Sequence, residues 1–335
     1  MARRPSNDTS SRPVSMADVA RAAGVSQQTV SRVANGLPNV NEQTRQRVQA
    51  AMQELGFRPS YAGRSLRDGR YHSVGLCVND VTKFGNLSMI DGIASAAREH
   101  NCAITLVEMS KTEEFSLAEA TRRMAALPVD GIIIGMSRMA PDFETFDPLP
   151  GIGTVIVTMY AHPRVTTVDS DHYGCSLLLM NHLFELGHEQ IRYIGGPSFS
   201  VDEQFRRAGW QDALERKHIE PAEPLEGDWS ANSGYEAGRY LAEHDHTMTA
   251  IYAANDQMAN GAIAALRDSG LRVPEDSLDD FVAHNELTTV RFDLHQRGRE
   301  VFEHAVPEAG TAGKTVAIRI PGQLIVRHTT AAPRT

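Results

Sequence analysis

One continuous stretch near the N-terminus decides how this chain begins to fold: Val19-Ala20-Arg21-Ala22-Ala23-Gly24-Val25-Ser26-Gln27-Gln28-Thr29-Val30-Ser31-Arg32-Val33. Apolar residues recur at helical spacing on both sides of Gly24, and glycine readily adopts the left-handed conformation that ends a helix. Serines stand where each helix would begin, and their hydroxyls cap free backbone amides there. The pattern predicts helices Met16–Ala23 and Gln27–Asn35 joined by a turn that contains glycine, which is the helix-turn-helix signature.

Outside this stretch, a third helix is predicted after Asn41, because Val48, Met52 and Leu55 are spaced for one apolar face. On the second helix the outward residues are of types that read bases. Glutamine pairs with adenine and arginine with guanine through two hydrogen bonds, whereas serine more often contacts phosphate. A small helical hairpin with a polar, solvated face would carry the same residue types, so these types alone leave both interpretations open.

The distribution of charge favours a nucleic-acid partner for this end of the chain. Residues 1–72 contain 11 arginines, no lysine and 5 acidic residues, a net charge of +6, and the other residues carry −15, which together give −9. A small basic head on a large acidic body indicates that only the head meets a polyanion. A basic tail without a role is the alternative reading.

From residue 73 onward, strands alternate with helices, the pattern of parallel α/β sheets. Two such series follow each other without a low-complexity linker, so we expect two similar lobes with a ligand cleft at the carboxyl ends of their strands. The expected elements are strands 73–79, 103–109, 131–135, 154–159, 190–195 and 250–254, and helices 86–100, 117–127, 173–186, 202–218, 232–244 and 258–269.

Several polar or aromatic side chains stand where such a cleft would lie. Asn255 and Asp256 follow a strand and offer groups suited to vicinal hydroxyls, Arg206 falls in the first turns of a helix, and Trp229 could stack on a sugar ring. Each has an ordinary alternative: a helix cap for Asn255, a surface ion pair for Arg206 and a core position for Trp229.

These segments, taken together, resemble the lac repressor (LacI/GalR) family from about residue 15 to about residue 330, with patchy stretches between 80 and 165. The resemblance is carried by Val19–Val33, Asn41–Pro59, Ala208-Gly209-Trp210, Glu226-Gly227-Asp228-Trp229-Ser230-Ala231 and Ala254-Asn255-Asp256-Gln257-Met258-Ala259. It implies a repressor that is released from a palindromic DNA operator by a sugar, typically a galactoside. It also implies DNA contacts and an effector pocket: Gln27, Gln28, Thr29, Ser31, Arg32, Asn35 and Leu66 for DNA, and Asn79, Arg206, Trp229, Asn255 and Asp256 for the effector.

The domain organisation that follows combines the residue patterns with this resemblance. We expect a flexible tail (1–14), a helix-turn-helix headpiece (15–59), a hinge (60–72) whose segment Ser60–Leu66 becomes helical on DNA, and two periplasmic-binding-protein-like lobes. The N-terminal lobe is expected to comprise 73–168 and 287–306, and the C-terminal, effector-binding lobe 169–286 and 307–330. The chain lacks the leucine-heptad tail of tetrameric members, so a homodimer with two headpieces is expected.

Departures from the family concern the hinge and the pocket. Gly63 replaces the usual alanine, which costs about 1 kcal/mol in a helix interior. Phe292 takes the place of a pocket glutamine, and Thr158 or Met159 lies where an acid is expected. The family also places a buried strand ending in Gly-x-Asp-Asp after the segment Val273–Asp276. Here Ser277–Glu286 is about eight residues too short and too polar for a central parallel strand, which opens the alternative of a DNA-binding regulator without an effector response.

Other classes of protein find little support in the sequence. His188-Glu189-Gln190-Ile191-Arg192 lacks the second histidine of a zinc protease, and Asp169-Ser170-Asp171-His172 stands in no nucleophile motif. Three scattered cysteines fit neither a disulfide framework nor a metal cluster. We therefore expect no enzyme, metal or cofactor, no secretory signal or membrane span, and a cytoplasmic location. The remaining alternative is a sugar-binding protein or sugar-processing enzyme without a DNA role.

Overall fold

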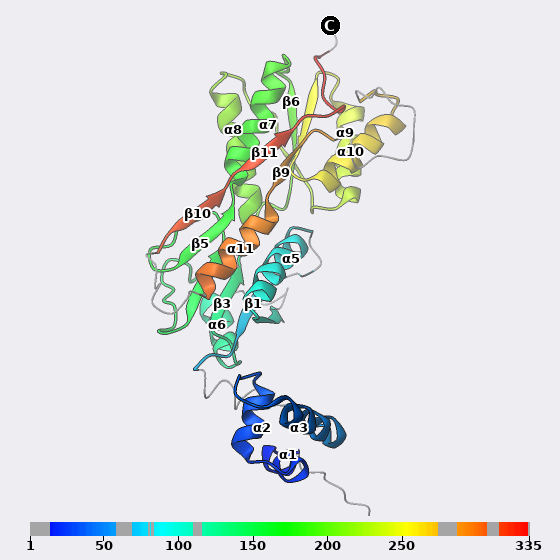
Figure 1. Cartoon of the computed structure of the whole chain (residues 1–335). Coiled ribbons are helices and arrows are strands. Elements are labelled where there is room, and N and C mark those ends of the chain that lie inside the picture. The colour runs from blue at the N-terminus through cyan, green and yellow to red at the C-terminus, as the bar shows by residue number, and fades with distance from the viewer. Residues whose placement is uncertain are drawn as a thin grey trace, which may run out of the picture. The chain divides into compact units, whose positions relative to one another are not determined.

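A computed structural model describes residues 14–57, 69–79, 81, 84–109, 116–273, 287–306 and 315–333. The chain divides into two compact units, Met1–Tyr71 and His72–Thr335, which are described separately (Figure 1). In the described ranges, no helix is both long enough and apolar enough to cross a membrane. The predicted hinge segment Ser60–Leu66, including Gly63, lies outside the described residues.

The described part of the first unit contains three helices: α1 (Met16–Ala23), α2 (Gln27–Ala34) and α3 (Glu42–Leu55). The Ser15 hydroxyl accepts a hydrogen bond from the amide of Asp18, whose carboxylate accepts one from the Ser15 amide, and Gly24 ends α1 with φ of +62°. A small apolar core joins the helices, with Val19, Val30 and Val48 each 0% exposed. The predicted helix-turn-helix is thus confirmed, because caps and apolar spacing are local properties of the sequence.

In the second unit, the N-terminal lobe is built on a six-stranded parallel sheet ordered β10-β5-β4-β3-β1-β2. The helices α5 and α11 cover one face of this sheet, and α6 covers the other. The central strands are buried on both faces, as parallel sheets require. The elements are β1 (Ser73–Val78), α5 (Phe84–Glu99), β2 (Ala103–Glu108), α6 (Leu117–Ala125), β3 (Gly131–Gly135), β4 (Gly153–Val157), β5 (Thr166–Ser170), α11 (Leu294–Ala305) and β10 (Ala317–Ile320).

The C-terminal lobe has a shorter parallel sheet, ordered β7-β6-β8, among the described residues. Tyr193 on the central strand and Trp210 stack at 5.0 Å inside its core. The outer edge of β8 has no strand partner in the described part of the chain, and residues 274–286 lie outside it. The elements are α7 (His172–Glu185), β6 (Ile191–Gly195), α8 (Val201–Glu215), β7 (Leu225–Glu226), α9 (Ala231–His244), β8 (Ala250–Ala253) and α10 (Asp256–Asp268).

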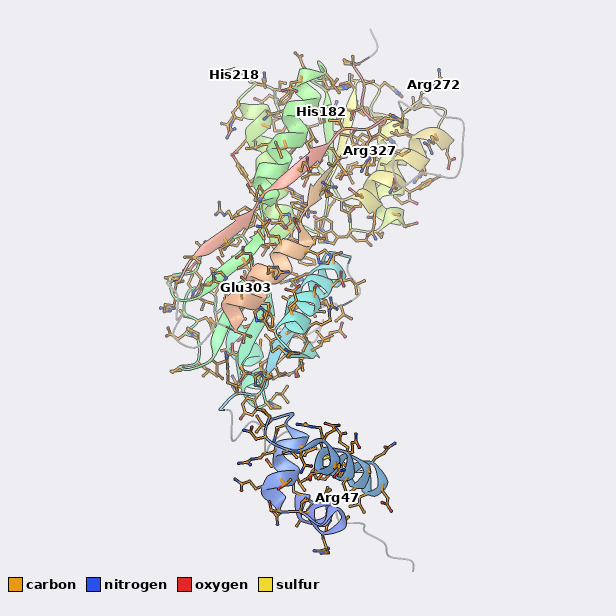
Figure 2. All side chains as sticks on the ribbon, in the orientation of Figure 1. Arg47, His182, His218, Arg272, Glu303 and Arg327 are labelled. Carbon is orange, nitrogen blue, oxygen red and sulfur yellow. The ribbon has the colours of Figure 1, made fainter. Side chains whose placement is uncertain are left out.

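The chain crosses between the lobes near β5, before α11 and at Pro321. An antiparallel pair, β9 (Thr289–Phe292) and β11 (Gly322–Ile325), packs against α7 of the C-terminal lobe. The last described segment also belongs to this lobe, because His182 contacts Thr330 at 2.9 Å and Arg327 donates to the Leu287 carbonyl at 2.7 Å (Figure 2).

Two of the expected lobe assignments are wrong in part, since α11 does lie in the N-terminal lobe and β11 in the C-terminal lobe. Residues 307–330 were expected wholly in the C-terminal lobe, but β10 pairs in parallel with β5 and completes the N-terminal sheet. Residues 287–306 were expected in the N-terminal lobe, but β9 pairs with β11 beside α7. Both strands are four residues long, and nothing within such short runs specifies which sheet edge they join.

Candidate functional site

The outward face of α2 presents free polar side chains. Gln27, Gln28 and Arg32 are exposed, and none of them has a partner among the described residues. Gln28 and Arg32 are four positions apart, so they lie on the same side of the helix. Because α2 is stabilised by its buried Val30 and Val33, these three side chains are free to contact a ligand without any cost to the helix.

The three other predicted DNA-contact residues of this segment, Thr29, Ser31 and Asn35, make hydrogen bonds at the two ends of α2. The Thr29 hydroxyl lies 3.0 Å from the Ser26 hydroxyl at the N-cap. At the other end, the Asn35 side chain donates to the backbone carbonyl and the hydroxyl of Ser31. Each keeps some exposed surface. The remaining predicted contact, Leu66, lies outside the described residues.

In the core, the structure brings together three of the five predicted effector residues, and Arg206 lies at their centre. This half-buried guanidinium projects from the second turn of α8. Its Nη1 donates to the Ala254 carbonyl at 2.6 Å, and its Nη2 donates to Nδ1 of His172 at 3.2 Å. The guanidinium carbon lies 5.2 Å from the centre of the Trp229 ring. The surface ion pair considered as an alternative is not formed among the described residues.

Asn255 and Trp229 are joined by the backbone. The Asn255 side chain accepts a hydrogen bond from the Met258 amide at 2.8 Å and donates to the Trp229 carbonyl at 2.9 Å. Asn255 therefore caps α10, which is the ordinary role considered for it in the sequence analysis. Its side chain also holds the Trp229 backbone through a hydrogen bond. Trp229 has φ of +74° and packs over Gly196, where any β-carbon would overlap the indole. This glycine is required by the close approach of the ring.

The other two predicted effector residues stand apart from this cluster. Asp256 is exposed, and one of its carboxylate oxygens accepts a hydrogen bond from the Thr289 hydroxyl at 2.7 Å. Asn79 follows β1 in the N-terminal lobe, and its buried side-chain oxygen has no hydrogen-bond partner among the residues that the structure describes. An orphaned buried acceptor is costly, which marks Asn79 as a position where a ligand hydroxyl could supply the missing donor.

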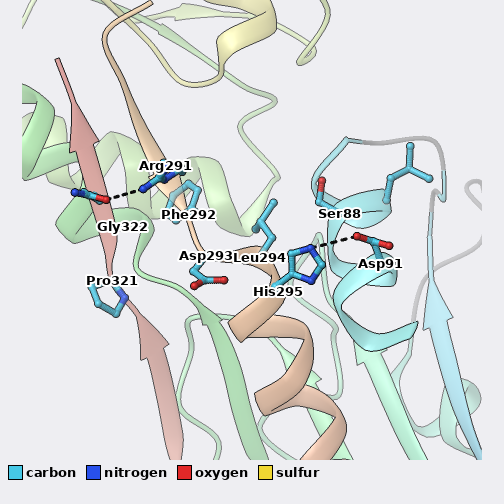
Figure 3. A pocket seen from close by; sticks show the side chains of 11 residues that line it. Ser88, Asp91, Arg291, Phe292, Asp293, Leu294, His295, Pro321 and Gly322 are labelled. Carbon is cyan, nitrogen blue, oxygen red and sulfur yellow. Dashed lines mark hydrogen bonds and ion pairs between the residues drawn. The ribbon is translucent and has the colours of Figure 1, made fainter. Parts of the chain in front are cut away.

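A hollow of about 830 Å³ opens where the lobes join, between the start of α5, the β9–α11 corner and the β10–β11 turn (Figure 3). None of the five predicted effector residues lines it. Phe292 connects the two places, because it lines the hollow and its ring also lies edge-on to His172 at 5.2 Å. On its walls, Nε2 of His295 lies 3.4 Å from a carboxylate oxygen of Asp91, and Arg291 donates a hydrogen bond to the Gln323 side chain.

A buried charged cluster that sequence reasoning passed over adjoins Arg206. Asp169 on β5 accepts a hydrogen bond from Nη1 of Arg297 at 3.1 Å, and both side chains are almost fully buried. Burial raises the pKa of Asp169, but the facing His172 ring, the Arg297 guanidinium and the Ser170 amide outweigh that effect and hold this pKa below its ordinary value. The only sequence signal was the polar run Asp169-Ser170-Asp171-His172, which shows no partner for Asp169.

Part of the same cluster has side chains of the types that bind metal ions. Ligand atoms of Asp169, His172 and Asp202 all lie within 4.8 Å of one another. A metal on Nε2 of His172 would leave Nδ1 to donate its proton outward, as metal-bound histidines do. Nδ1 instead faces the Arg206 guanidinium, which can only donate. The residues present therefore do not fit a metal at this position.

The two lobes also touch directly beside the candidate effector cluster. The Tyr160 ring, from the N-terminal lobe, lies 4.8 Å from the Phe205 ring on α8, and its hydroxyl donates to Gln204 at 3.1 Å. The Val201 amide donates to the Ser137 carbonyl at 3.1 Å. Any ligand that contacts Arg206 would therefore bind beside the contacts that hold the lobes together.

A helix-turn-helix head followed by a two-lobed periplasmic-binding-like core defines a class: ligand-responsive transcriptional regulators. Residues 15–60 match the family model "Bacterial regulatory proteins, lacI family", and residues 180–330 match "Periplasmic binding protein-like domain". The chain is 30% identical to the lactose operon repressor of Escherichia coli (strain K12), over 97% of this chain and 92% of that protein.

Solved structures agree with this assignment. A lac repressor bound to ONPG in its repressed state matches with a TM-score of 0.83 and 29% identity, over 95% of this chain and 100% of that chain. A lac repressor dimer bound to operator and the anti-inducer ONPF matches with a TM-score of 0.81 and 28% identity, over 96% of this chain and 100% of that one. This chain belongs to the lacI family of bacterial regulatory proteins.

Proposed function

We propose that this protein is a cytoplasmic transcriptional repressor that binds a palindromic operator as a homodimer and is released by a sugar of the galactoside class. The observation that carries the proposal is the presence, in one chain, of an exposed Gln27–Gln28–Arg32 face on α2 and the Arg206–Trp229–Asn255 cluster in the core. The relatives named above are repressors; one lac repressor is solved with operator and the anti-inducer ONPF, and another with ONPG.

Selection of bound DNA from a random pool, repeated with and without galactosides, tests the whole proposal. A palindromic consensus that is lost when a galactoside is added supports it. Recovery of no preferred sequence would instead favour a sugar-binding protein or enzyme without a DNA role. A salt-dependent mobility shift separates these classes before the selection is made, because phosphate contacts make DNA affinity fall steeply with salt.

Arg32→Ala is expected to weaken operator binding by about 1–3 kcal/mol per half-site and to relax the preference at one base pair, because a bidentate arginine–guanine contact is lost. A binding-site selection with the variant measures this directly. Arg47→Ala is the matched control, since Arg47 is an exposed arginine on α3 of the same domain. An unchanged consensus with Arg32→Ala contradicts the assignment of α2 as the reading helix.

Arg206→Ala is expected to abolish release by sugar while operator affinity stays at the wild-type value. The guanidinium keeps unused N–H donors beside the Trp229 ring, an arrangement suited to hold two neighbouring hydroxyls over an apolar surface. Titration of galactosides into the operator complex of both proteins checks this. Loss of DNA binding in the variant, or normal release, counts against the role of Arg206.

Release requires that the sugar favour one arrangement of the lobes, since a ligand shifts an equilibrium only by its differential affinity for the two states. Phe205 and Val201, which contact Tyr160 and Ser137 of the N-terminal lobe, lie on α8, the same helix as Arg206. A sugar that repositions α8 would change these contacts between the lobes. This gives the core a mechanical route from effector binding to a change in lobe arrangement.

A second candidate function is a DNA-binding regulator that has lost its effector response. It is favoured by the unpaired outer edge of β8 in the described part of the chain, where the family has a further strand with an acid that contacts the sugar. Calorimetry with galactosides separates the two candidate functions, because a regulator without an effector response should bind operator but no sugar.

A further inference from the structure

A line of polar contacts runs from the N-terminal lobe to Arg206 through one histidine. Nη2 of Arg297 donates to the Gly85 carbonyl at 3.1 Å, and its Nη1 donates to Asp169 at 3.1 Å. Nε2 of His172 faces Asp169 at 3.7 Å and Asp202 at 3.5 Å. On the other side of the same ring, Nδ1 receives the Arg206 donor.

The neighbours of this ring determine which nitrogen carries the proton. Arginine has only donors, so Nδ1 must offer its lone pair to Arg206. The proton of the neutral imidazole then lies on Nε2, which points toward two carboxylates. His172 is only 3% exposed, and its buried Nε2 makes no hydrogen bond within the described part of the chain, the two carboxylates being its nearest charged neighbours. The ring is further held by Phe292, whose ring centre lies 5.2 Å away.

We propose that His172 is the positioning residue of the effector site, a neutral Nε2-protonated imidazole that holds the Arg206 guanidinium between the Ala254 carbonyl and the Trp229 ring. This inference rests on the proposed function, in which Arg206 contacts the sugar. An arginine side chain loses much rotamer freedom when it is fixed, and a partner that fixes it beforehand lowers the cost of ligand binding. His172 supplies that partner from the other side of the cluster.

The position of His172 also ties this arrangement to the N-terminal lobe. Asp169 lies on β5 of the N-terminal sheet, and Arg297 lies on α11, whereas Arg206 and Ala254 belong to the C-terminal lobe. The imidazole is the one side chain that faces Asp169 and Arg206 at once among the described residues. A sugar that moves Arg206 would therefore act on the lobe connection through this ring.

Two amide substitutions of His172 test the roles of its two ring nitrogens one at a time. In His172→Asn, the amide lies near the position of Nδ1 and its oxygen can still accept from Arg206, but the group that faces the carboxylates is lost. In His172→Gln, the amide lies near the position of Nε2 and the acceptor for Arg206 is lost. If His172 positions Arg206, the Asn variant should behave like wild type and the Gln variant like Arg206→Ala.

Acrylamide quenching of tryptophan fluorescence reads the position of Arg206 without any ligand. The chain has two tryptophans. Trp210 is 0% exposed, so quenching reports the half-buried Trp229, over whose ring Arg206 lies. We expect the quenching constant of the Gln variant to rise to that of Arg206→Ala, and that of the Asn variant to stay at the wild-type value. Equal quenching in the Asn and Gln variants, at either level, would overturn the proposal.

Calorimetry with ONPG and measurement of operator affinity in the full chain complete the test. His172→Gln is expected to weaken ONPG binding roughly tenfold or more, the range for losing a hydrogen bond to a charged group, and His172→Asn by less than about threefold. Both variants should bind operator as wild type does. If the wild type binds no galactoside, the sugar part of the proposed function fails, whereas the quenching comparison still decides the role of His172.

Zinc titration of the wild-type protein tests the alternative that Nε2 of His172 is a metal ligand. No zinc binding that depends on His172 is expected, because Nε2 carries the proton. Tight binding that both variants abolish would show that Nε2 is a free metal ligand and would refute the tautomer on which the proposal depends.

Discussion

Arg297→Leu is expected to lower the melting temperature of the core unit by roughly 6–20 °C, the equivalent of about 3–5 kcal/mol for a unit of this size. The substitution removes the partner of Asp169 and leaves a buried carboxylate without its counter-charge. The side chains of Arg297 and Asp169 are only 8% and 4% exposed, so solvent cannot replace the lost interaction. Thermal unfolding followed by calorimetry or circular dichroism measures the shift.

The double variant Asp169→Asn with Arg297→Leu should recover most of this loss, because removing both charges also removes their desolvation cost. Arg299→Leu is the control on the same helix. Arg299 contacts Glu99 at 2.7 Å, but both side chains are about half exposed, and exposed ion pairs contribute little. A double variant as unstable as Arg297→Leu, or an equal loss in the control, contradicts the role assigned to the buried pair.

The pH dependence of this pair has a defined sign. The pKa of Asp169 is lower in the folded state than its unfolded value of about 3.9. The stabilisation is therefore present above that unfolded value and is lost as the pH falls through the lowered folded pKa. The melting temperature of the wild type should accordingly fall relative to that of the double variant as the pH is lowered below about 4, whereas their difference should be constant near neutral pH.

Insertion of an eight-residue apolar strand ending in Gly-x-Asp-Asp after Asp276 is expected to stabilise the C-terminal lobe by several kcal/mol and to strengthen sugar binding. Roughly three to five aliphatic side chains would become buried, at about 1.5–3 kcal/mol each. The outer edge of β8 has no strand partner among the described residues, and its Ile251 is only partly buried. The gain is comparable with the whole stability margin of a typical domain, about 5–15 kcal/mol.

Melting temperature and calorimetric galactoside affinity, before and after insertion, measure this effect. An insertion of equal length made of Gly and Ser serves as the control, because it lengthens the segment without supplying apolar surface. Equal melting and equal affinity for the wild type and the apolar insertion would show that Leu278–Val282 already fills the edge, and that the chain does not lack this strand.

The headpiece and most elements of the lobes were predictable because their signals are local. Ser15, Gly24 and Ser26 set the ends of α1 and the start of α2 within a few residues. The helices and strands expected between residues 73 and 269 are present with ends displaced by at most three residues. Five strands that the sequence pattern did not indicate, β5, β7, β9, β10 and β11, are two to five residues long, too short for a periodic pattern. The helix α11, of 12 residues, was not expected either, although Val301, Phe302 and Ala305 on its buried face have helical spacing.

The candidate effector cluster was predictable in part. Asn255 lies just after β8, and Arg206 lies near the start of α8, the helix that follows β6. Because the carboxyl ends of parallel strands meet at one edge of the sheet, the proximity of these two residues follows from the α/β pattern. The pattern does not say which of these side chains would make contact. Asp256 turns to Thr289 instead, and Asn79 stays apart in the other lobe.

The amino-acid sequence by itself determined the helix-turn-helix, the two α/β lobes and the family, because capping, apolar spacing and a long motif act over short separations. Only the tertiary structure decided that β10 completes the N-terminal sheet, that Asp169 pairs with Arg297, and that His172 faces Arg206. Asp169 and Arg297 are 128 residues apart. No local pattern encodes such a pair, because it exists only once β5 and α11 pack together and exclude the water that would otherwise solvate both charges.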